Sequence, residues 1–192
     1  MRWQLAGVVL AGFLVFDTLP AAAHVPVFVD SPTIETAYQI DDVTYQTGLY
    51  GTIAYPGAVQ YYRLDLGDPR MVSLFLLVPN SSGCRDFRPQ LAVIGSAVGE
   101  MTSHDLVVVP DGMSVLSASS PFWGRFIDAD TRLPYFAGPR LYPELEAGTY
   151  YLAVYDGTGG VGNFMLLTGD LDSVASDPAW IADAELHHAC GV

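Results

Sequence analysis

The sequence predicts an all-β protein, an antiparallel β-sandwich or jelly roll, on three observations. Short apolar or alternating segments rich in Val, Ile, Tyr, Phe and Thr recur along the chain. Gly, Pro, Asn or Asp residues bound these segments. Almost no stretch has the apolar spacing of an amphipathic helix. A chain of this length corresponds to one ordinary domain.

The first 23 residues have the composition of a cleavable signal peptide. Arg2 precedes an uncharged run at 5–16, which is too short to span a membrane. The small residues Ala21-Ala22-Ala23 follow, so we expect cleavage before His24; an uncleaved anchor is the alternative. We therefore expect an extracytoplasmic protein, periplasmic or secreted, with a β domain at 24–169 and a tail at 170–192. No later apolar segment has the length of a membrane span.

The chain is strongly acidic, with a formal net charge of −13, and it contains no lysine. Removing the leader takes away one Arg and one Asp, so the charge of the remaining chain is unchanged. Without a basic surface the protein cannot neutralise a phosphate backbone, which excludes nucleic acid as a partner. The acidic excess predicts a solvated surface that weakly favours cationic partners or metal ions.

Each apolar or alternating segment is expected to form a strand. The expected strands are 24–29, 47–54, 59–66, 71–78, 91–94, 106–109, 114–117, 149–155 and 163–168. The clearest alternation, at 59–66, puts Tyr61 and Arg63 on one face and Tyr62 and Leu64 on the other. The runs at 71–78 and 106–109 are almost wholly apolar, so we expect both to be core strands covered on both sides.

Residues 118–147 do not follow the strand rhythm and predict a long loop, because Pro and Gly recur throughout. The loop carries a group of aromatic residues that could stack on a sugar or anchor a protein partner. The candidate contact residues are Phe122, Trp123, Phe126, Tyr135 and Phe136. The alternative is a loop folded over an open sheet face. In the tail, a short helix is expected from near Asp177-Pro178, packed on the sandwich edge.

The two cysteines, Cys84 and Cys190, predict a single disulfide in an oxidising compartment. Such a bond would tie a mid-chain loop to the C-terminus and close a loop of roughly 100 residues. Two free thiols, or a bond from Cys190 to another chain, are the alternatives. Neither cysteine has a CxxC neighbour, so a redox site or a zinc ribbon is not expected.

Three segments carry a family resemblance. They are Gln60-Tyr61-Tyr62-Arg63-Leu64-Asp65-Leu66, Val72-Ser73-Leu74-Phe75-Leu76, and Gly148-Thr149-Tyr150-Tyr151 continuing through Gly159-Gly160 into a closing strand. Over about residues 59–168 the chain resembles the bacterial pre-peptidase C-terminal domain, a secreted β-sandwich. The region 118–147 departs from that pattern. The resemblance implies a non-catalytic fold with binding, stabilising or targeting roles, and it brings no active-site residues.

Some members of that family carry acidic calcium-binding loops. This chain has three acidic pairs that could be compared with such a loop: Asp41-Asp42, Asp65 with Asp68, and Asp128 with Asp130. None of them aligns to the calcium loop of the family. Calcium therefore ranks below copper among the expected cofactors.

Cleavage before His24 would leave a free α-amine and an imidazole on one residue. Such a terminus chelates copper(II), and His24-Val25-Pro26-Val27-Phe28 therefore resembles the start of histidine-brace proteins. The second histidine would be His104, His187 or His188, with Asp105 or Glu185 as a neighbouring carboxylate. The alternatives are an exposed terminal His24, a loop edge at His104, and a solvated tail that contains His187 and His188. Neighbouring residues on a helix point in different directions, so His187 and His188 cannot readily share an ion.

No catalytic motif is present: no Gly-x-Ser-x-Gly elbow, no His-Glu-x-x-His, no phosphate loop and no dinucleotide fingerprint. We therefore expect no enzymatic activity, and a hydrolase ranks third. The first hypothesis is a non-catalytic binding or accessory module, or a subunit of a larger assembly, that contacts a partner protein or an envelope polymer. The second is a copper-binding protein that uses His24 and one more histidine, either as a carrier or with redox chemistry, and an oxidative enzyme is the bolder version of this hypothesis.

Overall fold

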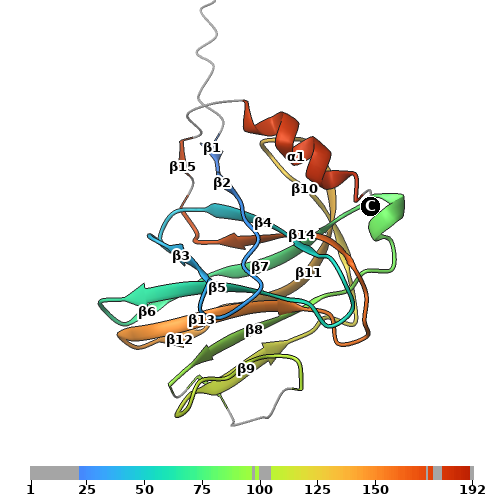
Figure 1. Cartoon of the computed structure of the whole chain (residues 1–192). Coiled ribbons are helices and arrows are strands. Elements are labelled where there is room, and N and C mark those ends of the chain that lie inside the picture. The colour runs from blue at the N-terminus through green and yellow to red at the C-terminus, as the bar shows by residue number, and fades with distance from the viewer. Residues whose placement is uncertain (1–21, 97, 100–104, 172, 175–178, 191–192) are drawn as a thin grey trace, which may run out of the picture.

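The described residues form two facing β-sheets, two short strand pairs, one α-helix and one 3₁₀ helix (Figure 1). The structure, a computed structural model, describes residues 22–96, 98–99, 105–171, 173–174 and 179–190. One sheet has six strands in the order β10-β11-β7-β14-β4-β2, and the other has five in the order β3-β5-β13-β8-β9. This arrangement confirms the predicted all-β sandwich class.

The described strands and helices have the following bounds. The six-stranded sheet consists of β2 (Val25–Phe28), β4 (Thr47–Ile53), β7 (Leu74–Pro79), β10 (Gly124–Ile127), β11 (Pro134–Leu141) and β14 (Gly162–Thr168). The five-stranded sheet consists of β3 (Tyr38–Ile40), β5 (Val59–Leu66), β8 (Gln90–Gly95), β9 (Ser114–Ala118) and β13 (Gly148–Tyr155). Two short pairs are β1 (Ala22–Ala23) with β15 (Ser173–Val174), and β6 (Arg70–Met71) with β12 (Glu144–Leu145). The helices are η1 (Ser82–Cys84) and α1 (Trp180–His188).

The main core lies between the two sheets and is built from alternate residues of each strand. On β5, Tyr62 and Leu64 face this core, whereas Tyr61 belongs to a second cluster on the outer side of the same sheet. Phe164 of β14 and Leu152 of β13 both lie in the main core, and they come from opposite sheets. Each such side chain contributes about 1.5–3 kcal/mol when it is fully buried.

Both sheets are also covered on their outer faces. On β7, Phe75 and Leu77 point away from the main core and pack with Ala184 of α1. The side chain of Val107 packs against the outer face of the five-stranded sheet. All residues of β7 are buried, so the expectation of a doubly covered strand at 71–78 is confirmed for Leu74–Pro79.

Three predictions about the fold were wrong: one strand, one loop and the antiparallel pairing of all strands. Residues 106–109 form no strand, because the Val108 backbone N–H donates to the Tyr61 hydroxyl at 2.8 Å rather than to a neighbouring strand. Val108 is also 56 % exposed, so this run is not covered on both sides. The region 118–147 is not a long loop but a β-hairpin of β10 and β11 followed by β12. The sheets are mixed rather than antiparallel throughout, since β2 pairs with β4 and β3 pairs with β5 in parallel.

A disulfide and the helix tie the C-terminal segment to the sandwich. Cys84 and Cys190 are bonded, which confirms the predicted pairing. The predicted helix exists, but it begins at Trp180, and the proposed cap at 177–178 lies outside the described residues. The helix covers the outer face of the six-stranded sheet rather than a sandwich edge, because Trp180 and Ala184 pack there with Tyr50.

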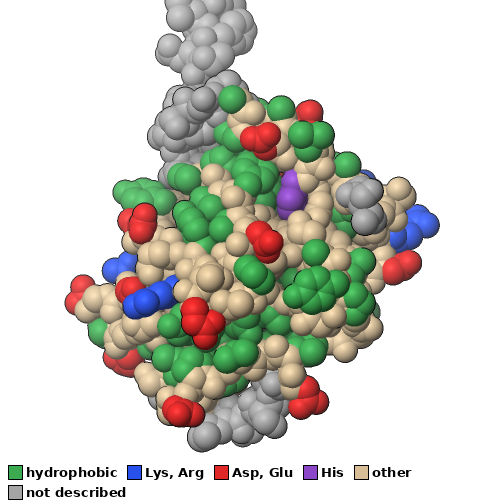
Figure 2. All heavy atoms as spheres, in the orientation of Figure 1, with side chains coloured by type: hydrophobic (Ala, Val, Ile, Leu, Met, Phe, Trp, Pro, Cys, Tyr) green, Lys and Arg blue, Asp and Glu red, His purple; other side chains and the backbone are tan. Residues whose placement is uncertain are grey.

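The carboxylates of the visible face are spread over the surface and do not form one patch (Figure 2). This distribution is that of a solvated acidic surface. Within the described part of the chain, no helix is both long and apolar enough to cross a membrane.

Candidate metal centre

The first component of the site is His24, which immediately precedes β2 and is only 2 % exposed. Parallel pairing of β2 with β4 brings its ring over Gly48. A Cβ added at Gly48 would lie 2.3 Å from His24 Cδ2, so the missing side chain provides the space for the imidazole. The alternative of an exposed His24 is therefore wrong.

The second component is the turn between β10 and β11, which holds its own shape by hydrogen bonds. Asp128 Oδ2 accepts a hydrogen bond from the Thr131 backbone N–H at 2.9 Å and another from its hydroxyl at 2.6 Å. The Arg132 N–H donates to the Asp128 carbonyl at 3.0 Å, and the Asp128 N–H donates to the Leu133 carbonyl at 3.1 Å. These bonds leave Asp128 Oδ1 and the carboxylate of Asp130 free to face His24.

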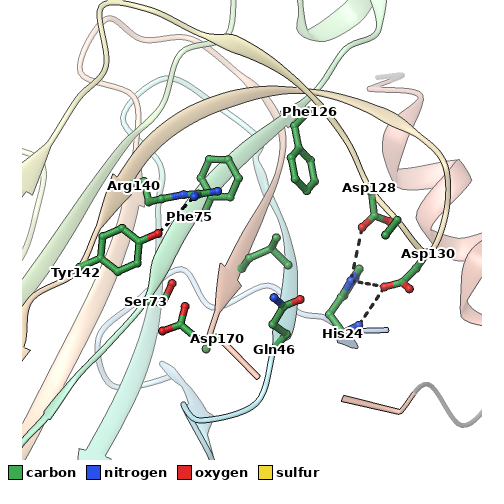
Figure 3. A pocket seen from close by; sticks show the side chains of 13 residues that line it. His24, Gln46, Ser73, Phe75, Phe126, Asp128, Asp130, Arg140, Tyr142 and Asp170 are labelled. Atoms are coloured by element: carbon green, nitrogen blue, oxygen red, sulfur yellow. Dashed lines mark hydrogen bonds and ion pairs between the residues drawn. The ribbon is translucent and has the colours of Figure 1, made fainter. Parts of the chain in front are cut away.

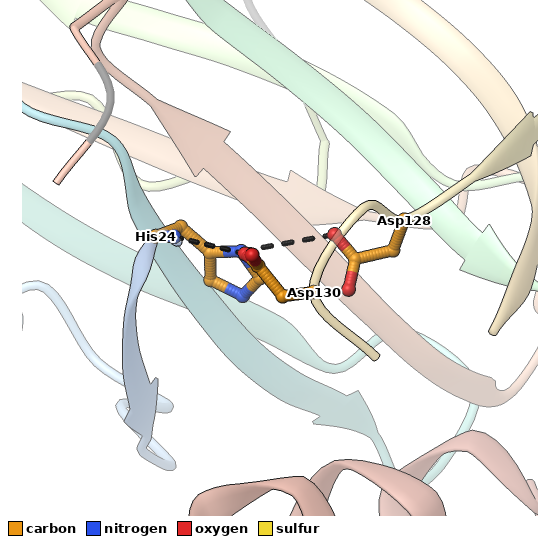
Figure 4. Close-up of side chains that lie close together, drawn as sticks. All are labelled: His24, Asp128 and Asp130. Carbon is orange, nitrogen blue, oxygen red and sulfur yellow. Dashed lines mark hydrogen bonds and ion pairs between the residues drawn. The ribbon is translucent and has the colours of Figure 1, made fainter. Parts of the chain in front are cut away.

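The two components meet in a compact cluster (Figure 4). Asp130 Oδ2 lies 3.0 Å from His24 Nδ1 and 3.0 Å from the His24 backbone nitrogen. Asp128 Oδ1 lies 3.8 Å from the same Nδ1. One ligand-capable atom from each of the three residues lies within 4.8 Å of the other two. The side chains of Asp128 and Asp130 are 5 % and 7 % exposed, so the cluster is shielded from water.

The other ring nitrogen of His24 is held by Tyr50, whose hydroxyl lies 3.0 Å from Nε2. A carboxylate only accepts hydrogen bonds, so the neutral ring carries its proton on Nδ1 and Nε2 accepts from the tyrosine hydroxyl. Trp180 of α1 packs edge-on against the same ring, with centroids 5.1 Å apart. The imidazole is thus fixed in orientation before any ligand arrives.

The electrostatics of the cluster leave an excess of negative charge. Burial lowers the pKa of His24, and this effect outweighs the opposing attraction of Asp128 and Asp130, so the ring is neutral. Burial raises the pKa of Asp130, and the charge of Asp128 raises it further. Among the described residues, no Arg forms an ion pair with either carboxylate. Asp130 Oδ1 is buried and has no hydrogen-bond partner.

A buried neutral imidazole beside two carboxylates is a suitable donor set for a divalent metal ion. Metal–ligand bonds of about 2.0–2.1 Å place adjacent donors roughly 3 Å apart, and the two contacts of Asp130 Oδ2 have this length. A cation at this position would offset the buried negative charge and provide a partner for the orphaned carboxylate oxygen. Figure 3 shows that the cluster lies at one end of a pocket.

The histidines predicted as second brace ligands do not join this cluster. The Nε2 of His187 bonds to the Gly51 carbonyl at 3.0 Å, and that of His188 bonds to the Pro134 carbonyl at 2.6 Å. Both therefore bind backbone oxygens of the six-stranded sheet, and neither belongs to a solvated tail. They point to different strands, as expected for neighbours on a helix. His104 lies outside the described residues.

The predicted partner-binding aromatic residues are mostly directed inward. Tyr135 is fully buried, and Phe126 packs in the cluster under α1. Trp123 and Phe136 pack against the main core, and both rings lie near the guanidinium of Arg88. Phe122 alone of the five is strongly exposed, at 84 %. Four of the five predicted contact residues therefore pack against the main core or in the cluster under α1.

Sequence reasoning did not select Asp128 and Asp130 as partners of His24. The Asp-x-Asp spacing was visible, but the two carboxylates lie more than 100 residues from His24 along the chain. Of the other two acidic pairs, Asp65 bonds to Arg63 and Thr149, and Asp42 accepts the Thr44 backbone N–H. Only the pair at 128 and 130 meets a nitrogen ligand.

The fold and the site define a β-sandwich protein with a buried histidine–dicarboxylate cluster. No family model matches the chain, and no curated protein is significantly similar to it. The resemblances to the pre-peptidase C-terminal domain and to histidine-brace proteins thus stay predictions.

We expect Gly48→Ala to lower the free energy of unfolding by about 1–3 kcal/mol, because the new methyl group displaces the His24 ring. Urea denaturation measures this change. Gly67→Ala is the matched control, since a Cβ at Gly67 would meet nothing within 4 Å. Equal stability of the two variants would contradict the proposed role of Gly48.

A pH prediction follows from His187, whose pKa burial lowers from 6.5 to about 4. Between these values the unfolded chain binds a proton at this residue and the folded chain does not, so stability falls as pH falls from 6.5 to about 4. We expect His187→Phe to flatten this part of the profile, measured as unfolding free energy against pH. Parallel profiles for the two proteins would show that His187 does not cause the dependence.

Proposed function

We propose that this protein binds a copper(II) ion in the extracytoplasmic space, using a mature N-terminus that begins at His24. The observation that carries the proposal is the position of Asp130 Oδ2, 3.0 Å from both the backbone nitrogen and Nδ1 of His24. After cleavage that nitrogen is an amine, and the amine and ring nitrogen of one histidine chelate a metal together. The carboxylates of Asp130 and Asp128 complete a donor set of two nitrogens and two oxygens.

This donor set favours copper(II) over calcium and over other divalent first-row metal ions. Tetragonal nitrogen and oxygen coordination is characteristic of Cu(II), which also stands at the top of the affinity order for divalent first-row metals. Calcium prefers oxygen ligands alone, so a site with two nitrogens disfavours it. In this proposal the carboxylates of Asp128 and Asp130 replace the second histidine of a brace.

Binding would change the protonation of the His24 ring. The Nδ1 proton must leave when the metal binds there, and Nε2 then carries the ring proton and donates it to the Tyr50 hydroxyl. Tyr50 can accept this bond because a hydroxyl both donates and accepts. Copper uptake should therefore release protons and weaken as pH falls.

The hypothesis of a partner-binding module has less support. It depended on a long loop with outward-facing aromatic residues, whereas this region forms a hairpin in which Phe122 alone of the five predicted residues is strongly exposed.

The test is a competitive Cu(II) titration of a chain that begins at His24, with its N-terminus verified by intact mass. Two variants remove single donors: Asp130→Asn removes the carboxylate, and a serine inserted before His24 removes the amine but keeps the ring. We expect one-to-one binding that each variant weakens about 100-fold or more. Asp111→Asn, at an exposed residue away from the cluster, is the control and should bind as the parent does.

Two outcomes would overturn the proposal. Binding that neither variant weakens would place the ion elsewhere on this acidic protein. Binding that Asp130→Asn abolishes but the serine insertion leaves intact would show a side-chain site in which the α-amine takes no part.

A further inference from the structure

The pocket next to the metal cluster extends well beyond the space that an ion needs. Its volume is about 360 Å³, within the range of pockets that hold small molecules. His24, Asp128 and Asp130 line one end, and Arg140 and Asp170 line the pocket away from that cluster (Figure 3). The proposed copper site therefore leaves most of this pocket unexplained.

Arg140 on β11 presents a positive charge that the protein itself does not neutralise. Its guanidinium carbon lies 3.8 Å from the centroid of the Phe75 ring, and Nη1 donates to the Tyr142 hydroxyl at 3.3 Å. No carboxylate of the described residues lies within ion-pair distance of it. Stacking on Phe75 orients the planar group and leaves further N–H donors available for a carboxylate.

Asp170, which follows β14, presents the opposite charge to the same pocket. Its backbone is anchored by a hydrogen bond from its N–H to the Thr44 carbonyl at 3.3 Å. No Arg or His of the described chain pairs with its carboxylate. Arg140 and Asp170 thus line one pocket as unlike charges that do not pair with each other.

We propose that this pocket binds a small zwitterion, a free α-amino acid with an apolar side chain. Its carboxylate binds Arg140, its ammonium group binds Asp170, and its side chain packs against the apolar wall formed by Phe126 and Leu167. A simple anion is disfavoured because Asp128, Asp130 and Asp170 all line the pocket. A simple cation leaves Arg140 unpaired.

The proposal does not depend on copper binding, so it is tested on metal-free protein in the presence of a chelator. Isothermal titration compares L-phenylalanine with 3-phenylpropanoate, which lacks the ammonium group, and with 2-phenylethylamine, which lacks the carboxylate. Arg140→Gln and Asp170→Asn each remove one charge and keep the approximate size of the side chain. Both residues are exposed, so the variants are expected to fold, and thermal melts check this.

We expect L-phenylalanine to bind, and each truncated probe to bind about ten-fold more weakly or worse, because one charge-assisted contact is lost. Arg140→Gln should weaken both carboxylate-bearing probes. Asp170→Asn should weaken phenylalanine and phenylethylamine but strengthen phenylpropanoate, since a repelling charge disappears. Opposite effects of Asp170→Asn on the ammonium-bearing probes and on phenylpropanoate would identify a site that binds both an ammonium group and a carboxylate.

Absence of phenylalanine binding at millimolar concentration would overturn the proposal. Equal affinity for the three probes would overturn it as well, because it would show recognition of the aromatic ring alone. The two proposals fail independently. A protein that does not bind copper can still bind phenylalanine in this pocket, and a protein that does not bind phenylalanine can still bind copper.

Discussion

Copper(II) should raise the melting temperature of the chain beginning at His24 by about 10 °C when the free ion is at roughly a thousand times its dissociation constant. Ligand binding to the folded state alone contributes about 4 kcal/mol at that excess. For a domain of this size, each kcal/mol corresponds to about 2–4 °C. Thermal melts followed by circular dichroism, with and without the metal, measure the shift.

The Asp130→Asn variant should lose this copper-induced rise in melting temperature, and its metal-free stability should change as well. Its carboxylate has a raised pKa because of burial and the neighbouring charge of Asp128. A raised pKa means that the folded protein loses stability as pH rises through that pKa, so ionised Asp130 destabilises the metal-free protein near neutral pH. Asn removes this cost and still accepts hydrogen bonds from His24. In the chain with a serine inserted before His24, where the His24 nitrogen is an amide, we therefore expect metal-free Asp130→Asn to melt above its parent. In the chain that begins at His24, Asp130→Asn should gain almost no stability from copper.

Two changes in melting temperature, the one caused by Asp130→Asn without metal and the one caused by copper, distinguish a metal-binding site from a structural ion pair. If Asp130 were only an anchor for His24, its replacement would destabilise the metal-free protein. In the serine-extended chain, which has no charged amine at His24, a metal-free Asp130→Asn variant that melts below its parent would thus contradict the assignment of this cluster as a cation site.

Replacing both Cys84 and Cys190 by alanine should lower the free energy of unfolding by about 2–5 kcal/mol. The disulfide links residues 106 positions apart and fastens the end of α1 to η1. Its removal restores conformational freedom to the unfolded chain, and it also loosens the helix that covers Tyr50. Urea denaturation of the double variant measures the loss.

Reduced parent protein is the matched control for the disulfide, because it breaks the same bond without changing the chain. The parent in dithiothreitol and the double variant should show similar urea midpoints. A double variant within about 1 kcal/mol of the oxidised parent would mean that α1 is held by packing alone.

The sequence alone predicted those parts of the fold that short-range pattern determines. The alternation at 59–66 matches β5 at both ends, and the predicted strands 149–155 and 163–168 agree with β13 and β14 within one residue. These segments could be recognised because a half-buried strand repeats every two residues. The bond between Cys84 and Cys190 could be predicted because the chain contains only two cysteines.

The hairpin of β10 and β11 was missed because its two strands contain Pro and Gly and lack regular alternation. Its strands are specified by partners: β11 pairs with β7, and a register shift between Ala137 and Arg140 accommodates Gly138 and Pro139. That shift also precedes the segment that carries Arg140 into the pocket. Local composition indicated a loop, whereas sheet pairing decided the structure.

The candidate site shows the same division between local and long-range information. From the sequence, His24 could be selected by its position after the Ala21-Ala22-Ala23 segment, and copper followed from the chemistry of a histidine terminus. Its partners could not be selected, because many carboxylates and three further histidines were equally available. Only the tertiary structure brings the turn after β10 against the start of β2 and turns His187 and His188 toward backbone carbonyls. Contacts between residues more than 100 positions apart depend on how the sheets pair, and no local pattern in the chain records them.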